Sequence, residues 1–423
     1  MTSTLAPVTP DPWVDLDPLQ SPAVGDRLAR EQLGHVDVHD PRRVAGLVSW
    51  LLQRAALDGS TVVSVDVVAA ALRAYDVLEP SAGVELALRE GRVAAFAEDR
   101  LLGHPVESVA EERVADALVE LVAEGQLATG SDLAAADLAA QVVASPLTVA
   151  VVPRGDTRRG LVRAVQSVAG ERAGFTWATG AEMDGQMEAL DAADVVVVDA
   201  AERLSASSGA LLLEALSDGR LSRLVLLGDP DELDGAAGRF FGDVVDSGVV
   251  PVCTLRDVRQ TAPLNVLGSA LRAGRLPVLD PSERSVVVTP AADSDQALDR
   301  AGQLLSTSVP RVFKVTPADT RLATLRTKGR CGVDALSAVA VDGVRVGTLE
   351  EICSESCEAL VLVLPAEAAG SLSRSALLSA AACATQHLSI VHQTGPALAD
   401  AVARRPRKVR RTRLAGLLSE TLG

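Results

Sequence analysis

The spacing of apolar residues divides the chain near Pro146. From Asp26 to about Gly125 apolar residues recur three and four positions apart, which is the period of amphipathic helices. A β-branched run at 60–64 followed by a helical stretch to Leu78 interrupts this pattern. Residues 26–145 are therefore expected to form a helical region, either a winged-helix module of the kind that binds DNA or plain helical packing. Residues 1–25, rich in Asp and Pro, are expected to be a loose arm.

After Pro146 the period changes to short apolar runs rich in β-branched residues, at 147–152, 195–198, 224–227 and 286–288. Helix-like segments alternate with these runs, at 158–171, 205–217, 263–273 and 293–306. Continuous apolar strands between helices predict a buried parallel sheet covered on both faces. A second series of runs begins near Arg311, so the fold class is α/β with two such domains. Their expected bounds are 146–280 and 281–423, with a hinge near Asp280.

Composition supports a globular protein and narrows its class. The chain has 423 residues, of which 48% are apolar and 23% charged. No run approaches the roughly 20 apolar residues that a membrane span needs, and no basic start precedes an apolar stretch near Met1, so a cytoplasmic protein is expected. Five cysteines without paired spacing argue against a disulfide framework. Cys353 and Cys357 lack two further ligands nearby, so no metal site is expected.

The net charge is −16, which opposes unassisted binding to phosphate backbones. Aromatic residues make up only 2%, so platforms for base stacking are scarce. One basic segment near the C-terminus is the exception, and its side chains are candidates for contacting DNA or phosphate; the alternative is a solvated helix end. These candidates are Arg404, Arg405, Arg407, Lys408, Arg410, Arg411 and Arg413.

Candidate chemistry lies where apolar strands end in acidic residues. The run at 194–199 ends in Asp199, and the run at 224–228 continues as Gly-Asp-Pro-Asp with Asp229 as its first acid. Arg259 and Gln260 follow the next run, at 250–255. A strand that ends in Asp presents a carboxylate to Mg²⁺ at the carboxyl edge of a sheet in nucleotide hydrolases. A structural role, as acidic turns held by helix N–H groups, is the alternative for all four residues.

This ordered series resembles superfamily I DNA helicases of the RecD/TraA type, a RecD-like group whose relatives include helix-hairpin-helix and AAA family ATPases. The resemblance covers about residues 145–420 and includes Ser247–Val252, Leu271–Pro277, Gly332–Leu336, Ala359–Pro365 and Arg411–Leu418. It implies two RecA-like domains of the P-loop NTPase type, with ATP and Mg²⁺ as cofactors and DNA as partner.

The phosphate-binding loop departs from that family. The family has Gly-Gly-Pro-Gly-Thr-Gly-Lys-Thr, in which glycine N–H groups wrap the phosphates, Lys reaches the β- and γ-phosphates and Thr holds Mg²⁺. This chain reads Val-Pro-Arg-Gly-Asp-Thr-Arg-Arg at 152–159, so only Gly155 remains of the glycines. Arg158 stands at the Lys position and Arg159 at the Mg²⁺-binding hydroxyl. Arginine keeps the charge but not the compact shape of lysine, so the Walker A motif is degenerate.

Three further positions of the ATP site are altered in the alignment to the family. Ala200 replaces the acid that orients water, Ala384 replaces the arginine that stabilises the transferring phosphate, and Ala135 replaces the adenine-reading Gln. Glu202 lies two positions beyond the lost acid and is expected to point elsewhere. The chain also lacks room for the family's DNA-contacting insertions at 163–194 and 335–357.

Three functions follow from these patterns. The first is a catalytically inactive pseudo-helicase that acts as a DNA- or protein-binding scaffold, needs no cofactor and has an unknown protein partner. The second is a divergent ATP-dependent DNA helicase or ATPase in DNA recombination and repair, in which ATP/Mg²⁺ binding survives. The third is a regulatory subunit without a nucleic-acid role. In the first, Asp199, Asp229, Arg259 and Gln260 are remnants of catalysis, and Gly155, Arg158 and Arg159 are remnants of nucleotide binding.

Overall fold

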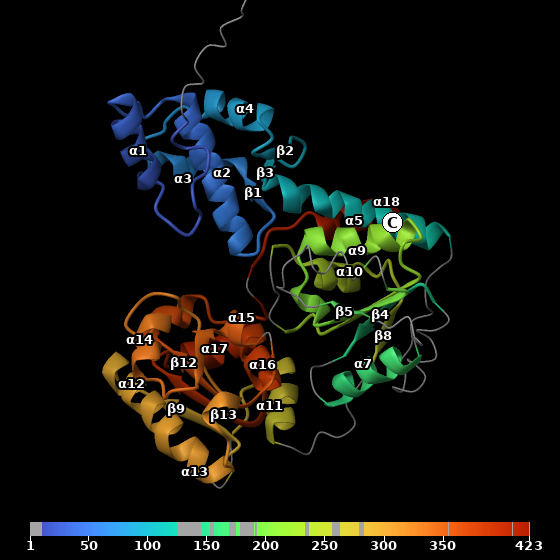
Figure 1. Ribbon diagram of the computed structural model, residues 1–423, viewed down its shortest axis with the longest axis vertical. Helices are drawn as coiled ribbons and strands as arrows, with labels where there is room; N and C mark the ends of the chain where they lie inside the picture. Colours follow the sequence, from blue (N-terminus) through green and yellow to red (C-terminus); the bar gives the residue numbers. More distant parts are fainter. Residues whose placement is uncertain are drawn as a thin grey trace, which may run out of the picture.

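A computed structural model of the chain describes residues 11–124, 145–152, 156–168, 175–177, 190, 193–232, 237–255, 263–278, 283–353, 355–407 and 409–422. The N-terminal helices lie beside two α/β units, each built around its own sheet (Figure 1). No helix in these ranges is both long and apolar enough to cross a membrane.

The N-terminal region is a helical module with a small antiparallel sheet. Its elements are α1 (Ala23–Leu33), α2 (Pro41–Leu57), β1 (Val62–Ser64), α3 (Val65–Arg73), α4 (Ser81–Arg89), β2 (Ala94–Phe96) and β3 (Leu101–Gly103). The strands pair in the order β1-β3-β2. From α2 onward, the sequence helix, strand, two helices and two strands is the arrangement of a winged helix. Asp40 caps α2 and Ser64 caps α3, each accepting a backbone N–H two or three residues on.

The first α/β unit contains a five-stranded sheet. Its strands are β4 (Leu147–Val151), β5 (Phe175–Trp177), β6 (Val195–Asp199), β7 (Arg223–Gly228) and β8 (Val252–Thr254). They pair in parallel in the order β5-β6-β7-β4-β8. Its other elements are α7 (Asp156–Val168), the 3-10 turn η1 (Ala201–Arg203), α9 (Ala206–Ser217) and α10 (Phe240–Ser247). The first strand lies between the fourth and the fifth, which is the strand order of a RecA-like core.

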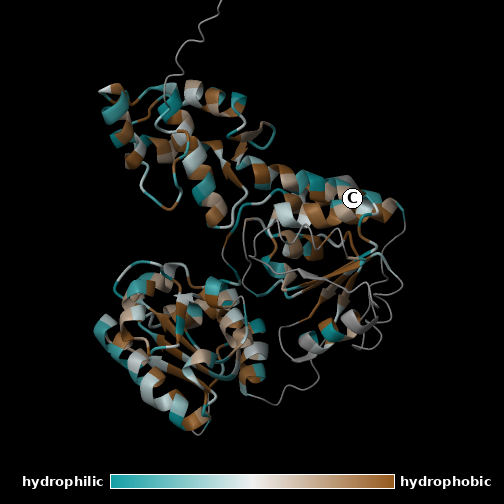
Figure 2. Cartoon of the chain, in the orientation of Figure 1, coloured by the Kyte–Doolittle hydropathy of each residue, from teal (hydrophilic) through white to brown (hydrophobic). Residues whose placement is uncertain are grey.

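Both faces of this sheet are buried, as the apolar runs predicted. Along β6, Val196 and Val198 join the core under α9 and α10, whereas Val195 and Val197 join the core under α7. The unbroken apolar runs follow from this, because alternate side chains enter different cores and neither face meets water. The hydropathy colouring shows the resulting apolar interior (Figure 2).

The second α/β unit also has a parallel five-stranded sheet. Its strands are β9 (Val286–Pro290), β10 (Thr320–Thr324), β11 (Arg345–Thr348), β12 (Cys357–Leu364) and β13 (Ala384–His392), in the order β11-β10-β12-β13-β9. Around it lie α11 (Pro263–Arg272), α12 (Ser294–Gln303), η2 (Leu304–Ser308), α13 (Val309–Phe313), η3 (Pro317–Asp319), α14 (Val333–Val339), α15 (Leu349–Ile352), η4 (Ala366–Gly370), α16 (Arg374–Cys383) and α17 (Ala397–Arg404). The expected fold class, two parallel α/β units behind a helical region, is confirmed.

Three helices pack against an α/β unit whose strands lie elsewhere in the sequence. The long helix α5 (Pro105–Ala123) follows the winged-helix module but lies on α9 of the first unit, and the last helix, α18 (Leu414–Leu422), packs on α5 and α10. Helix α11 precedes the expected boundary near 280, yet its leucines join the core of the second unit. The exact domain bounds stay a prediction, and the packing shows that both α/β units include helices from outside their own run of strands.

Candidate functional site

The acids that follow the apolar strands of the sequence meet at one edge of the first sheet. Strands β6, β7 and β4 are neighbours in that order, so their carboxyl ends lie at the same edge of the sheet. Helix α7 follows β4, Asp199 is the last residue of β6, and Asp229 directly follows β7. Strand β8 continues the sheet on the other side of β4, so the connection that follows β7 crosses over β4. In open parallel sheets, ligands bind in the crevice at such a change of direction. Arg158, Asp199 and Asp229 therefore lie where the fold would place a ligand.

Arg158 fills this crevice from the first turn of α7. It is only 1% exposed, which is rare for an arginine and requires partners on several sides. Its Nε donates to the Asp199 carboxylate at 2.5 Å, and one terminal nitrogen donates to the carbonyl oxygen of Val152 at 3.3 Å. The other terminal nitrogen lies 3.4 Å from the Glu202 carboxylate. The guanidinium thus lies between the end of β4 and the carboxylates of Asp199, which ends β6, and Glu202, which follows it.

Glu202 belongs to the site, which corrects the expectation that it points elsewhere. Ala200 adopts a left-handed backbone with φ 74°, and the 3-10 turn η1 begins directly after it. This reversal brings the fully buried Glu202 side chain back against Arg158. The same carboxylate accepts the backbone N–H of Asp229 at 3.2 Å. A strand end that ran straight on would have carried Glu202 away, and the left-handed residue is what the sequence pattern did not reveal.

Asp229 is buried and already paired. It is 2% exposed, its Oδ1 accepts the backbone N–H of Asp231 at 3.0 Å, and its Oδ2 accepts from the guanidinium of Arg272 on α11. Burial lowers the pKa of Arg272, but the neighbouring carboxylates of Asp229, Glu232 and Asp231 together outweigh this effect and raise the pKa above its ordinary value. Burial and the same carboxylate raise the pKa of Asp231. The turn after β7 is therefore an internally paired acidic cluster.

The other predicted site residues are less informative. Gly155, Arg259, Gln260, Lys408 and Ala135 lie outside the described residues, as does the side chain of Arg159. Ala384 is the first residue of β13 and is buried, so no charged group reaches the crevice from that position. Within the described part of the chain, no group of three His, Cys, Asp or Glu side chains is placed to hold a metal ion.

The basic segment is not a free arm along its whole length. Arg411 accepts the backbone N–H groups of Thr61 and Val62 through its carbonyl oxygen, at 3.0 and 3.4 Å. Arg413 stacks on the ring of Phe96 at 3.5 Å and pairs with Glu112 at 2.7 Å. Arg410 donates to the carbonyl oxygen of Gly238 at 3.0 Å. The segment thus runs between the winged-helix module and the first α/β unit.

Its remaining cations are more open to solvent. Arg407 lies 3.6 Å from Asp246, and Arg405 donates to the carbonyl oxygen of Ala369 at 2.7 Å. Arg404 lies 3.8 Å from Asp400 on its own helix, and both side chains are exposed. Arg404, Arg405 and Arg411 are the exposed arginines of the segment. They are the members of the predicted set that a phosphate group would reach most readily.

A buried carboxylate lies beneath this segment. Glu111 of α5 accepts the backbone N–H of Arg413 at 2.9 Å and the hydroxyl of Thr61 at 2.9 Å. Burial raises the pKa of Glu111 to about 8 and exceeds the opposite effect of these hydrogen bonds. Burial also raises the pKa of Asp243 on α10, which accepts from the Thr412 hydroxyl at 2.8 Å. The two acids anchor the C-terminal segment at two successive residues, Thr412 and Arg413.

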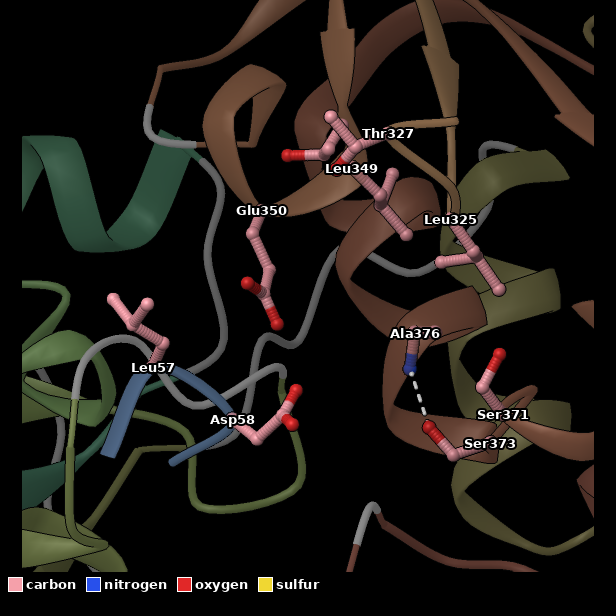
Figure 3. A pocket seen from close by; sticks show the side chains of 10 residues that line it. Leu57, Asp58, Leu325, Thr327, Leu349, Glu350, Ser371, Ser373 and Ala376 are labelled. Carbon is pink, nitrogen blue, oxygen red and sulfur yellow. Dashed lines mark hydrogen bonds between the residues drawn. The ribbon is translucent and has the colours of Figure 1, made fainter. Parts of the chain in front are cut away.

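A cavity of about 270 Å³ lies between the end of α2 and the second α/β unit (Figure 3). Four hydroxyl side chains and two carboxylates line it, together with apolar side chains; the charged pair is Asp58 and Glu350. The Ser373 hydroxyl is engaged, since it accepts the backbone N–H of Ala376 at 3.3 Å. The two acidic groups make this cavity a poor receptor for phosphate. None of its lining residues belongs to the Arg158 cluster.

No protein-family model matches this chain, and no curated protein matches it. Among solved structures it is similar to the arterivirus helicase nonstructural protein 10, with 14% identity and a TM-score of 0.36, covering 74% of this chain and 72% of that one. The same helicase in complex with DNA gives 13% identity, a TM-score of 0.35 and coverage of 71% and 69%. The PRRSV helicase is 14% identical, with a TM-score of 0.30, and the match covers 70% of this chain and 57% of that one. The strand orders, independently of these likenesses, show the two parallel α/β units.

Proposed function

We propose that this chain is a RecD-like, helicase-type protein that does not hydrolyse ATP and that serves as a scaffold for a protein partner. One observation carries the proposal: the guanidinium of Arg158 occupies the crevice and contacts the Asp199 carboxylate at 2.5 Å. Asp199 is the acid that the resemblance assigns to Mg²⁺. A guanidinium at contact distance neutralises that carboxylate and places a positive charge beside the Mg²⁺ position, so the residues present fit an ATP–Mg²⁺ complex poorly.

The side-chain chemistry supports the same proposal. Lysine presents a compact ammonium to phosphate oxygens, whereas Arg158 presents a planar fork whose nitrogens point to Asp199, Glu202 and the Val152 carbonyl oxygen. Displacing the fork would leave the buried Glu202 carboxylate without this partner, which is costly in an apolar interior. The net charge of −16 favours a protein partner over DNA, although DNA binding through the exposed arginines is retained as a second outcome.

The deciding experiment measures ATP binding and turnover by the purified full-length protein with Mg²⁺, with and without single-stranded DNA. We expect no saturable ATP binding and no turnover above the Asp199→Ala variant, which serves as the matched control. DNA-stimulated turnover that disappears in Asp199→Ala would overturn the proposal and establish a divergent ATP-dependent helicase or ATPase of the recombination and repair type. ATP binding without turnover would also contradict the proposed blockage by Arg158.

The class of partner is then distinguished by salt. Binding to DNA through arginines weakens steeply as salt rises, whereas binding to an apolar protein surface does not. A complex that forms with a purified partner protein at high salt, without nucleic acid, would support the scaffold. Absence of any DNA binding would exclude a DNA-binding scaffold and would leave the protein-partner scaffold and the third hypothesis, a regulatory subunit without a nucleic-acid role.

A further inference from the structure

An ion pair that is largely removed from solvent joins the remnant nucleotide site to the second α/β unit. Arg272 is the last residue of α11, and Leu264, Leu267 and Leu271 of that helix pack in the core of the second unit. Its guanidinium nevertheless binds Asp229, at the carboxyl end of β7 in the first unit. The Asp229 side chain is 3% exposed and that of Arg272 29%, so the pair is largely removed from solvent.

Each partner of this pair is held firmly in its own unit. On the first unit, the Asp229 backbone N–H donates to Glu202, which in turn lies 3.4 Å from the buried Arg158. On the second unit, the carbonyl oxygen of Arg272 accepts from Arg374 of α16 at 3.3 Å. Arg374 is anchored in turn by its Nε, which donates to the Val402 carbonyl oxygen at 2.7 Å.

A second contact links the two units near the same edge. Arg203, the residue after Glu202, donates to the backbone carbonyl oxygen of Glu350 on α15. The links therefore leave the first unit from adjacent turns, after β6 and after β7, and reach two different helices of the second unit. Two separate points of attachment restrict rotation between the units more than one point does.

From these contacts we infer that the altered nucleotide site is an interdomain clasp: Arg158, Glu202, Asp229 and Arg272 hold the two α/β units in one relative orientation without nucleotide. This inference rests on the proposed function, because it gives the arginine-filled crevice a structural purpose. A fixed orientation would present a scaffold surface of constant shape to a partner.

The test is the distance between the units in the full-length protein without nucleotide. Spin labels on cysteines introduced at Ser222 of the first unit and Ala338 of the second, both exposed, report it by pulsed electron resonance; all five native cysteines are buried. We expect one narrow distance peak that does not move when ATP and Mg²⁺ are added. Asp229→Asn and Arg272→Lys are each expected to abolish the single narrow peak.

Two additional variants keep this test decisive. The double variant Asp229→Asn, Arg272→Gln breaks the clasp without leaving an unpaired buried charge, and thermal unfolding followed by circular dichroism verifies that it is folded. Arg275→Gln removes a charge at an exposed position just beyond α11 and is expected to keep the narrow peak. A narrow, unshifted peak in the folded double variant, or a broad distribution in the unaltered protein, would overturn the clasp. Detection of ATP turnover would contradict the proposed function but would not alter this nucleotide-free measurement.

Discussion

At the scale of single residues, Arg158 is a buried cation that contacts two carboxylates of the first α/β unit. The side chain is 1% exposed and faces two carboxylates, so the first α/β unit depends on it. We predict that Arg158→Met lowers the free energy of unfolding of this unit by roughly 3–5 kcal/mol, because Glu202 would keep a buried charge without this partner.

Urea denaturation followed by circular dichroism measures this loss. Arg163→Met, at an exposed position on the same helix, is the matched control and is expected to change stability by less than about 0.5 kcal/mol. Adding Glu202→Gln to Arg158→Met should restore part of the loss, since the two residues form one network. Equal stability of Arg158→Met and the unaltered protein would show that the ion pairs contribute nothing.

The raised pKa of Glu111 predicts how the stability of the protein depends on pH. Its pKa in the folded protein is about 8, above the ordinary value of 4.5, so the folded state binds more protons than the unfolded state between these values. Stability from this group is fully present below about pH 4.5 and is lost as pH rises through 8. Glu111→Gln resembles the protonated form: its oxygen can accept from Arg413 and its amide can donate to Thr61. We therefore predict that this variant flattens the decline of melting temperature between about pH 5 and pH 8.

The matched control for this prediction is Glu120→Gln, an exposed position on the same helix. It is expected to leave the slope of melting temperature against pH as in the unaltered protein. If Glu111→Gln and Glu120→Gln give the same slope, Glu111 does not titrate in the range that burial implies.

The sequence identified part of this chemistry and missed the rest for definite reasons. Asp199 and Arg158 were recognisable because each occupies a position set by a strand end or a motif spacing. The direction of Glu202 was predicted wrongly because the sequence does not indicate that Ala200 adopts a left-handed backbone. This conformation costs an alanine energy and is uncommon. The pairing of Asp229 with Arg272 joins residues 43 apart in two packing units, so only the tertiary structure reveals it.

At the scale of elements, alternating strands and helices were predictable and their spatial order was not. The apolar runs located β4, β6, β7 and β9, because buried parallel strands are apolar on both faces. Whether a helix packs on the unit before or after it depends on the shape of both surfaces. Helix α11 illustrates this: its position in the chain assigned it to the first unit, and its leucines lie in the second.

The C-terminal segment is a second case in which the sequence did not predict which surface a helix packs on. Its arginines indicated either a contact with phosphate or a solvated helix end, and neither reading predicted that Leu414 and Leu418 of α18, directly after it, lie in the core beside α5 and α10. We predict that Leu418→Ala destabilises the protein by about 2–5 kcal/mol, because it empties a fully buried site. Ala415→Ser, at an exposed position of the same helix, should change stability by less than about 0.5 kcal/mol. Equal melting temperatures for both variants would mean that α18 does not dock stably.

At the scale of the whole molecule, the net charge limits the affinity of the chain for nucleic acid. The net charge of −16 repels phosphate, and the basic segment offsets it only locally. Within that segment Arg413 and Arg410 already bind groups of the protein, whereas Arg404, Arg405 and Arg411 are exposed. Among the arginines of this segment, these three exposed side chains should therefore contribute most to any binding of single-stranded DNA.

This argument predicts the salt dependence of DNA binding. Each phosphate contact to a single strand contributes about −0.7 to the slope of log affinity against log salt, so exposed arginines that bind three phosphates give a slope no steeper than about −2. Fluorescence anisotropy of a labelled oligonucleotide from low to physiological salt measures it. Replacing Arg404, Arg405 and Arg411 together by Gln should remove the slope, whereas Arg413→Gln should lower stability and leave the slope unchanged. A much steeper slope, or one that survives the triple replacement, would place the DNA on another surface and would shift the choice between protein and DNA partners toward DNA.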